Sequence, residues 1–191
     1  MASHNDVLGK IGLSTRKVTD NIIRVFAKAS EQDILDGKVW YEEAKALAVE
    51  CAVDGGMTLE QSAVMIAQLS PRLRWDKNVE AARSLVLTGK APGVLGRSVD
   101  RALQAMTAED PWSTFGKAPK TRSFALNILG DDNAVTVDVW AARVAGITEQ
   151  QLGRVGVYEA IAHCYRLAAK RAGIAPAQMQ AITWVVARGR A

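Results

Sequence analysis

Residues 119–146 read PKTRSFALNILGDDNAVTVDVWAARVAG, and this stretch decides the fold class. Proline is favoured in the first turn of a helix and glycine directly after the last turn, so Pro119 and Gly130 predict a helix between them. The β-prone run 135–137 follows, and behind it Asp138 has a side chain suited to cap a helix over residues 139–145. The stretch therefore predicts two helices joined by a short extended segment.

Helical patterning continues on the N-terminal side of this stretch. Thr58 and Gln61 form a capping-box pattern at the start of a dense apolar run, and Pro71 ends that run. We expect residues 31–37 to break the helical pattern and Ser98 to cap a helix of its own. No sustained alternation typical of a sheet is present. The sequence predicts an all-α protein with about eight to ten short-to-medium helices.

Composition bounds the class of protein. The 191 residues are 49% hydrophobic and 23% charged, which fits one globular domain and excludes a low-complexity chain. No apolar run reaches the roughly 18–20 residues of a membrane span, and no secretion leader is visible, so we expect a soluble, cytoplasmic protein. Two cysteines and two histidines predict neither a disulfide nor a metal site. Phosphate-loop and dinucleotide motifs are absent, so no nucleotide or other cofactor is expected.

The formal net charge of +4 is unevenly distributed. Residues 1–71 hold 7 Lys and Arg against 10 Asp and Glu, whereas residues 72–122 hold 10 against 5 and residues 123–191 hold 7 against 5. A cationic middle of this kind is typical of a surface that meets a polyanion such as DNA. An unevenly charged, solvated surface is the alternative.

Lys120 is expected at a helix start, where the helix dipole disfavours a cation. Neighbouring Lys117 and Arg122 disfavour its charged form further, and a neutral lysine can act as a nucleophile. Asp138 follows a segment that is expected to be buried, so we expect its carboxylate to lie at the edge of the core. The alternative is that Lys120 is a solvated helix-start residue and Asp138 a plain N-cap.

Taken together, these features resemble the helix-hairpin-helix DNA glycosylase superfamily, which contains endonuclease III-like and adenine-mismatch glycosylases. The order of features along the chain is that of the family: Lys120, the helix after it, the Val-Asp pair ending at Asp138, and Arg143 on a further helix. Eighteen residues separate the lysine from the aspartate, as in the family. Residues 59–71 are similar to the family's buried early helix, and Asn78 stands where the family has an asparagine. The resemblance covers residues 58–147. The compact size and the truncated family pattern are similar to those of glycosylase-like proteins carried by bacteriophages.

The hairpin before the lysine departs from the family's pattern. Gly116 is present, but Ala118 replaces the second glycine and Pro119 directly precedes Lys120. In the family, backbone N–H groups of this hairpin hold a DNA phosphate, so one small residue and one donor are missing here. The four-cysteine iron–sulfur tail of many relatives is also missing.

The resemblance implies a two-lobed helical fold, with one lobe over residues 58–115 and the other over residues 1–57 plus 116–191. It implies an enzyme that flips a damaged or modified base into a pocket between the lobes. Asp138 would stabilise positive charge on the sugar or orient a nucleophile, Lys120 would form a Schiff base, and Trp140 would lie near the base. The residues expected to hold DNA phosphates are Arg72, Arg74, Lys77, Gly116, Lys117 and Arg122.

Two alternatives stay open on the sequence. One is a transferase that modifies bases of phage DNA on the same fold, which would place the protein in the cytoplasm of the host cell. The other is a DNA-binding or protein-interaction module that has kept the fold without the chemistry.

Overall fold

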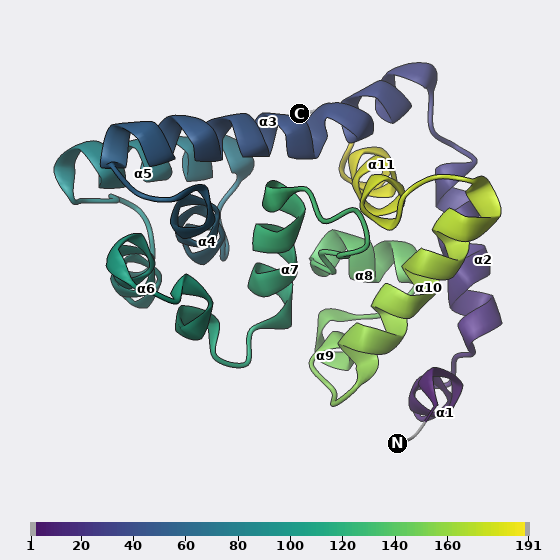
Figure 1. Ribbon diagram of the computed structural model, residues 1–191. Helices are drawn as coiled ribbons and strands as arrows, with labels where there is room; N and C mark the ends of the chain where they lie inside the picture. The colour runs from purple at the N-terminus through teal and green to yellow at the C-terminus, as the bar shows by residue number, and fades with distance from the viewer. Residues whose placement is uncertain (1–2, 190–191) are drawn as a thin grey trace. The chain divides into compact units, whose positions relative to one another are not determined.

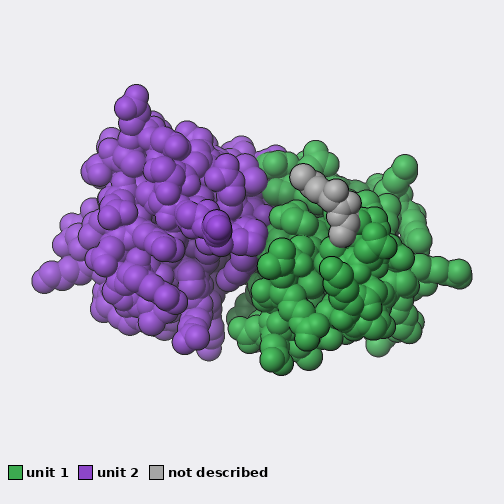
Figure 2. Space-filling view, turned by 90° about the horizontal axis from the view of Figure 1, so that it is seen from below, with its two compact units in different colours: residues 1–40, 131–191 green, residues 41–130 purple. Residues whose placement is uncertain are grey.

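The computed structural model describes residues 3–189 of the chain, and within that range it contains eleven α-helices, one 3-10 helix and no β-strand (Figure 1). The all-α prediction is therefore confirmed. The chain forms two compact units, coloured separately in Figure 2. Unit 1 comprises Met1–Trp40 and Asp131–Ala191, and unit 2 comprises Tyr41–Gly130.

Unit 1 is made of the N-terminal and C-terminal helices of the chain. These are α1 (His4–Gly9), α2 (Thr15–Phe26), the first part of α3 (Glu31–Gly55), α8 (Val139–Ala145), α9 (Glu149–Leu152), α10 (Val157–Ala172) and α11 (Pro176–Arg188). Helix α10 packs against α2, α1 and α11, and α11 also packs against α8. Val18, Ile22, Tyr165 and Met179 are fully buried where these helices meet.

Unit 2 is built around one buried helix. Its elements are the second part of α3, α4 (Leu59–Leu69), α5 (Trp75–Thr88), α6 (Gly96–Thr107), the 3-10 helix η1 (Pro111–Phe115) and α7 (Pro119–Leu129). Helix α4 packs against α5, α6, α7 and η1, and every residue from Ser62 to Leu69 is buried. A helix that is apolar all round belongs in the interior. The predicted capping box is confirmed, because Thr58 and Gln61 exchange hydrogen bonds of 3.1 and 2.8 Å.

The boundaries of the units differ from the expected 57/58 and 115/116. The second part of α3 contributes Leu47 and Cys51 to the core of unit 2, so the division falls at Trp40 inside α3. Helix α7 packs against α4, which places Lys120 in unit 2 and Asp138 in unit 1.

Two helix boundaries predicted from the sequence are wrong. Residues 31–37 do not break the helical pattern but form the start of the 25-residue helix α3. Gly37 is accommodated because a Cβ there would lie 2.5 Å from Ile182 Cγ1 and 2.7 Å from its Cα, so the glycine permits close approach to α11. Ser98 is not a cap. It lies buried inside α6, whose N-cap is Leu95.

Candidate functional site

The carboxylate of Asp138 is held from two sides within unit 1. Asp138 is the N-cap of α8, as predicted, and its Oδ1 accepts a 2.8 Å hydrogen bond from the backbone N–H of Ala141. Its Oδ2 accepts a 2.9 Å hydrogen bond from Nε1–H of Trp184 on α11. The residue is half-buried. The carboxylate is therefore fixed in orientation but still reaches the surface.

The segment that leads into Asp138 is extended without being part of a sheet. Residues 134–137 are buried, and the hydroxyl of Tyr158 accepts a hydrogen bond from Val137 N–H at 3.2 Å and donates one to Val135 O at 2.9 Å. Two turns further along α10, the Tyr165 hydroxyl donates to Ala141 O at 3.1 Å. The Tyr158 hydroxyl therefore satisfies buried backbone groups that a neighbouring strand would otherwise satisfy.

Three tryptophans lie around Asp138 or near it in the chain. The ring of Trp184 lies 4.7 Å from the ring of Trp40 at an angle of 43°, and the Arg188 guanidinium lies 4.8 Å from the Trp184 ring centre. Trp140, the expected neighbour of a flipped base, is half-buried, and Arg143 lies 4.6 Å over its ring. Each guanidinium is attracted to its ring face by a cation–π interaction.

Lys120 is the second residue of α7, as the proline before it predicts, and is half-buried. The connection from η1 to α7 contains Gly116, with φ 54° and ψ −129°, a combination that residues with a Cβ avoid. A Cβ at Gly116 would meet nothing within 4 Å, so the backbone conformation and not space requires glycine there. Lys117 is exposed on the same turn.

Arg122 also contacts an indole. Its guanidinium is exposed and lies 5.1 Å from the ring centre of Trp112 in η1, and Trp112 Nε1–H donates a hydrogen bond to the carboxylate of Glu60. The ring of Phe115 lies 5.7 Å from that of Trp112.

The other basic residues that we expected to bind DNA phosphates are clustered where α4 leads into α5. Arg72 is exposed with a φ of 64°, and Arg74 forms two hydrogen bonds, of 2.6 and 3.1 Å, with the carboxylate of Asp76. The Arg74 guanidinium lowers the pKa of Asp76 to about 2. Lys77 binds both carboxylate oxygens of Glu80, at 2.9 and 2.7 Å. Arg74 and Lys77 are thus partly neutralised by their own helix.

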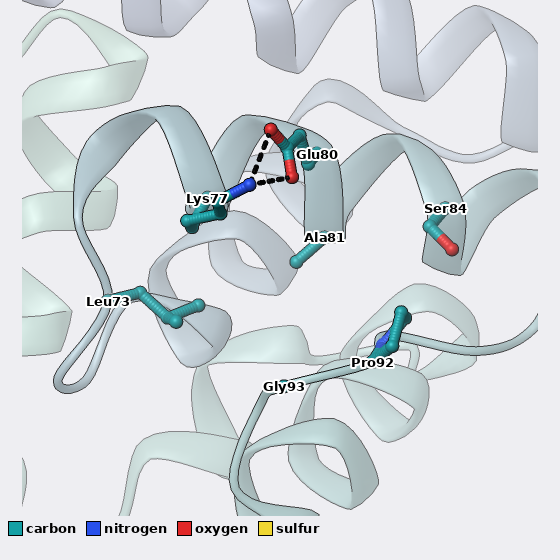
Figure 3. Close-up of a pocket in the computed structure, with 7 residues that line it drawn as sticks. All are labelled: Leu73, Lys77, Glu80, Ala81, Ser84, Pro92 and Gly93. Atoms are coloured by element: carbon teal, nitrogen blue, oxygen red, sulfur yellow. Dashed lines mark hydrogen bonds and ion pairs between the residues drawn. The ribbon is translucent and has the colours of Figure 1, made fainter.

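Lys77 and Glu80 also line a groove of about 400 Å³ beside α5 (Figure 3). Its other lining residues are Leu73, Ala81, Ser84, Pro92 and Gly93. The lining carries one ion pair and mostly small or apolar side chains. The chemistry-bearing residues Lys120 and Asp138 are not part of it.

The cysteines and histidines form no metal centre. No group of three or more His, Cys, Asp or Glu side chains is placed to hold a metal ion anywhere in residues 3–189. Cys51 and Cys164 are buried, and burial raises the pKa of each thiol to about 11. The rings of His4 and His163 stack at 4.3 Å. Over the same described range, no helix is both long and apolar enough to cross a membrane.

Sequence reasoning missed the partners of Asp138. Trp184 lies 46 residues further along the chain, and nothing local in the sequence links the two. Trp40 and Trp184 carry core-like helical spacing, which predicts burial without saying which neighbours they meet. No pattern in the sequence indicated that Tyr158 would bond to the segment before Asp138.

The fold and the candidate site define an all-α protein of two helical units, with a fixed carboxylate among indoles in one unit and a helix-start lysine in the other. The chain belongs to DUF7178, a family of unknown function, whose model matches residues 4–191. No curated protein and no solved structure matches the sequence.

Proposed function

We propose that this protein is a DNA-acting enzyme that flips a damaged or modified base and cleaves its bond to the sugar. The observation that carries the proposal is the Asp138 carboxylate, oriented by Ala141 N–H and Trp184 Nε1–H at the start of the helix that carries Trp140 and Arg143. An oriented carboxylate suits a reaction in which positive charge develops on a sugar, because it is already in place when the charge forms. Aromatic rings and arginines suit the base and the phosphate of the same nucleotide.

Lys120 is the proposed nucleophile. Its neutral amine would attack C1′ of the sugar while the glycosidic C–N bond breaks, and the departing base would carry away the bond's electron pair and a proton. The C1′–O4′ bond would then break, and O4′ would take its electron pair and the remaining N–H proton, which leaves a Schiff base between Lys120 Nζ and C1′. Asp138 would stabilise the cationic sugar as the base leaves.

Borohydride trapping tests this chemistry. Borohydride reduces a Schiff base to a stable amine, so wild-type protein incubated with abasic-site DNA should give a covalent adduct. Lys120→Ala should abolish the adduct, and Lys28→Ala, which removes an exposed lysine outside the proposed DNA-binding residues, should retain it. Asp138→Asn should retain DNA binding and lose base release. A wild-type protein that gives no adduct, or an undiminished adduct with Lys120→Ala, would refute lysine catalysis.

A second candidate is a DNA-binding module without chemistry. It is favoured by the internal hydrogen bonds of Asp138, since an N-cap bonded to Ala141 and Trp184 already has a structural role. DNA binding without an adduct would favour this module or a base-modifying transferase over the lyase. Release of an intact base would then separate an N-glycosylase from both.

A further inference from the structure

Two groups of arginines in the described chain differ in the partners of their guanidinium groups. One group forms ion pairs with carboxylates: Arg16 and Arg171 with Asp20, Arg74 with Asp76, and Arg83 with Glu50. The other group lies over indole rings: Arg122 over Trp112, Arg143 over Trp140, and Arg188 over Trp184. Within residues 3–189, none of the three stacked arginines forms an ion pair with a carboxylate.

The stacked arginines of unit 1 can keep their charge without an acidic partner because of where they lie. Arg143 is in the last turn of α8 and Arg188 in the last turn of α11. The C-terminal end of a helix carries partial negative charge from its unpaired carbonyls, which favours a cation there. The indole face adds a cation–π attraction. Both positive charges are therefore held in place and remain available to an anion.

Stacking also presents the guanidinium edge to a ligand. Where a guanidinium lies flat on a ring, one face of the planar group is covered, and the N–H donors in its plane can match two oxygens of a phosphate. Ordering the side chain in advance lowers the entropy lost on binding. A paired arginine such as Arg171 has to give up Asp20 first.

Arg188 lies next to Asp138 through a shared ring. Trp184 carries Arg188 over its face at 4.8 Å and donates its Nε1–H to Asp138 at 2.9 Å. Although both groups touch the same indole, Arg188 and Asp138 form no ion pair. The cation and the carboxylate are thus separate groups that share one indole as a neighbour.

We infer that Arg143 and Arg188 are the phosphate-binding residues of unit 1 and that they hold the phosphodiester backbone of DNA beside Asp138. This inference rests on the proposed function for the choice of DNA as the polyanion. It assigns phosphate binding to the two arginines, and it assigns to Trp140 and Trp184 the role of holding those arginines in place.

The salt dependence of DNA binding tests the inference. We would measure the affinity of wild-type protein for a fluorescein-labelled duplex of unmodified DNA by anisotropy between 50 and 200 mM KCl. Each phosphate contact contributes about 0.9 to the slope of log affinity against log salt. Arg143→Gln and Arg188→Gln should each reduce the slope by about 0.9, so that the advantage of wild type over the variant shrinks about 3.5-fold across this range.

Arg171→Gln is the matched control. Arg171 also lies in the last turn of a unit 1 helix, but it is paired with Asp20 at 2.9 Å and stacks on no indole. Its loss should leave the slope unchanged. Circular dichroism of each variant would establish that it is folded before binding is measured.

The results separate failure of this inference from failure of the proposed chemistry. An adduct on Lys120 together with unchanged slopes in Arg143→Gln and Arg188→Gln would overturn the inference alone. Reduced slopes without any adduct would support the inference and exclude lyase activity through Lys120. An equal loss in Arg171→Gln, or binding to anionic phosphatidylserine vesicles in place of DNA, would overturn it as well.

Discussion

Replacing Gly37 with alanine adds one methyl group where α3 meets the backbone of α11. The new Cβ would lie 2.7 Å from both the backbone N and the Cα of Ile182, whereas ordinary contacts of a Cβ begin at about 3.4 Å. A side chain can rotate out of such a clash, but backbone atoms of a neighbouring helix cannot. The two helices would have to move apart by about 0.7 Å, the difference between these distances.

The energetic consequence follows from two opposing effects. Overpacking a tightly packed contact costs about 1–3 kcal/mol, and a backbone contact belongs at the upper end because it cannot relax by a rotamer change. Alanine is favoured over glycine inside a helix by about 1 kcal/mol, which offsets part of this cost. We therefore expect Gly37→Ala to lower the free energy of unfolding by about 2 kcal/mol. The contact between Trp40 and Trp184 should loosen with it, since both rings lie on the same two helices.

Urea unfolding of the full chain, followed by circular dichroism and tryptophan fluorescence, measures this change as a shift in midpoint at constant slope. Gly9→Ala is the control. Gly9 ends α1 in the same unit and a Cβ there meets nothing within 4 Å, so Gly9→Ala should not lower the free energy of unfolding and should raise it by at most about 1 kcal/mol. A Gly37→Ala protein as stable as wild type would refute the close approach of α3 and α11.

Three further predictions concern local features. Gly116→Ala should lower the free energy of unfolding by about 1–3 kcal/mol in the same urea assay, because φ 54° with ψ −129° strains any residue with a Cβ; no loss would contradict the backbone conformation. Burial, with the nearby charges of His4 and Arg166, holds the pKa of His163 below its usual 6.5, so the unfolded chain takes up this proton at a higher pH than the folded chain. Stability should therefore fall as the pH is lowered below about 6.5, and His163→Gln should reduce that fall; an unchanged pH profile would refute the assignment. Cys51 and Cys164, each with a pKa of about 11, should react slowly with a thiol reagent at pH 8 in the folded protein and rapidly in guanidinium, and rapid reaction of the folded protein would contradict their burial.

Local signals predicted the helix boundaries that depend on local chemistry. Pro119 and Gly130 bound α7, and Asp138 caps α8, as expected, because a missing N–H, a left-handed glycine and an N-cap carboxylate act within a few residues of the chain. The sequence pattern also predicted the buried helix α4 with its capping box.

Contacts between distant segments explain the wrong predictions. Gly37 suggests a break when read locally, but it lies inside α3 because it has to fit against Ile182. Trp184 reaches Asp138 across 46 residues, and no periodicity encodes that distance. The division of α3 at Trp40 depends likewise on which core each half of the helix joins.

Whether an arginine pairs with a carboxylate or lies over an indole changes the electrostatic field that a polyanion meets at a distance from the protein. A paired arginine and its carboxylate form a dipole, whose field weakens with distance faster than that of a single charge and is soon lost behind the salt screening length of about 8–10 Å. The basic middle of the sequence includes Arg74 and Lys77, both cancelled in this way by Asp76 and Glu80. A stacked arginine remains a single charge. Arg122, Arg143 and Arg188 should therefore add to long-range attraction as single charges, together with exposed basic residues such as Arg72 and Lys117, which also form no ion pair within the described residues.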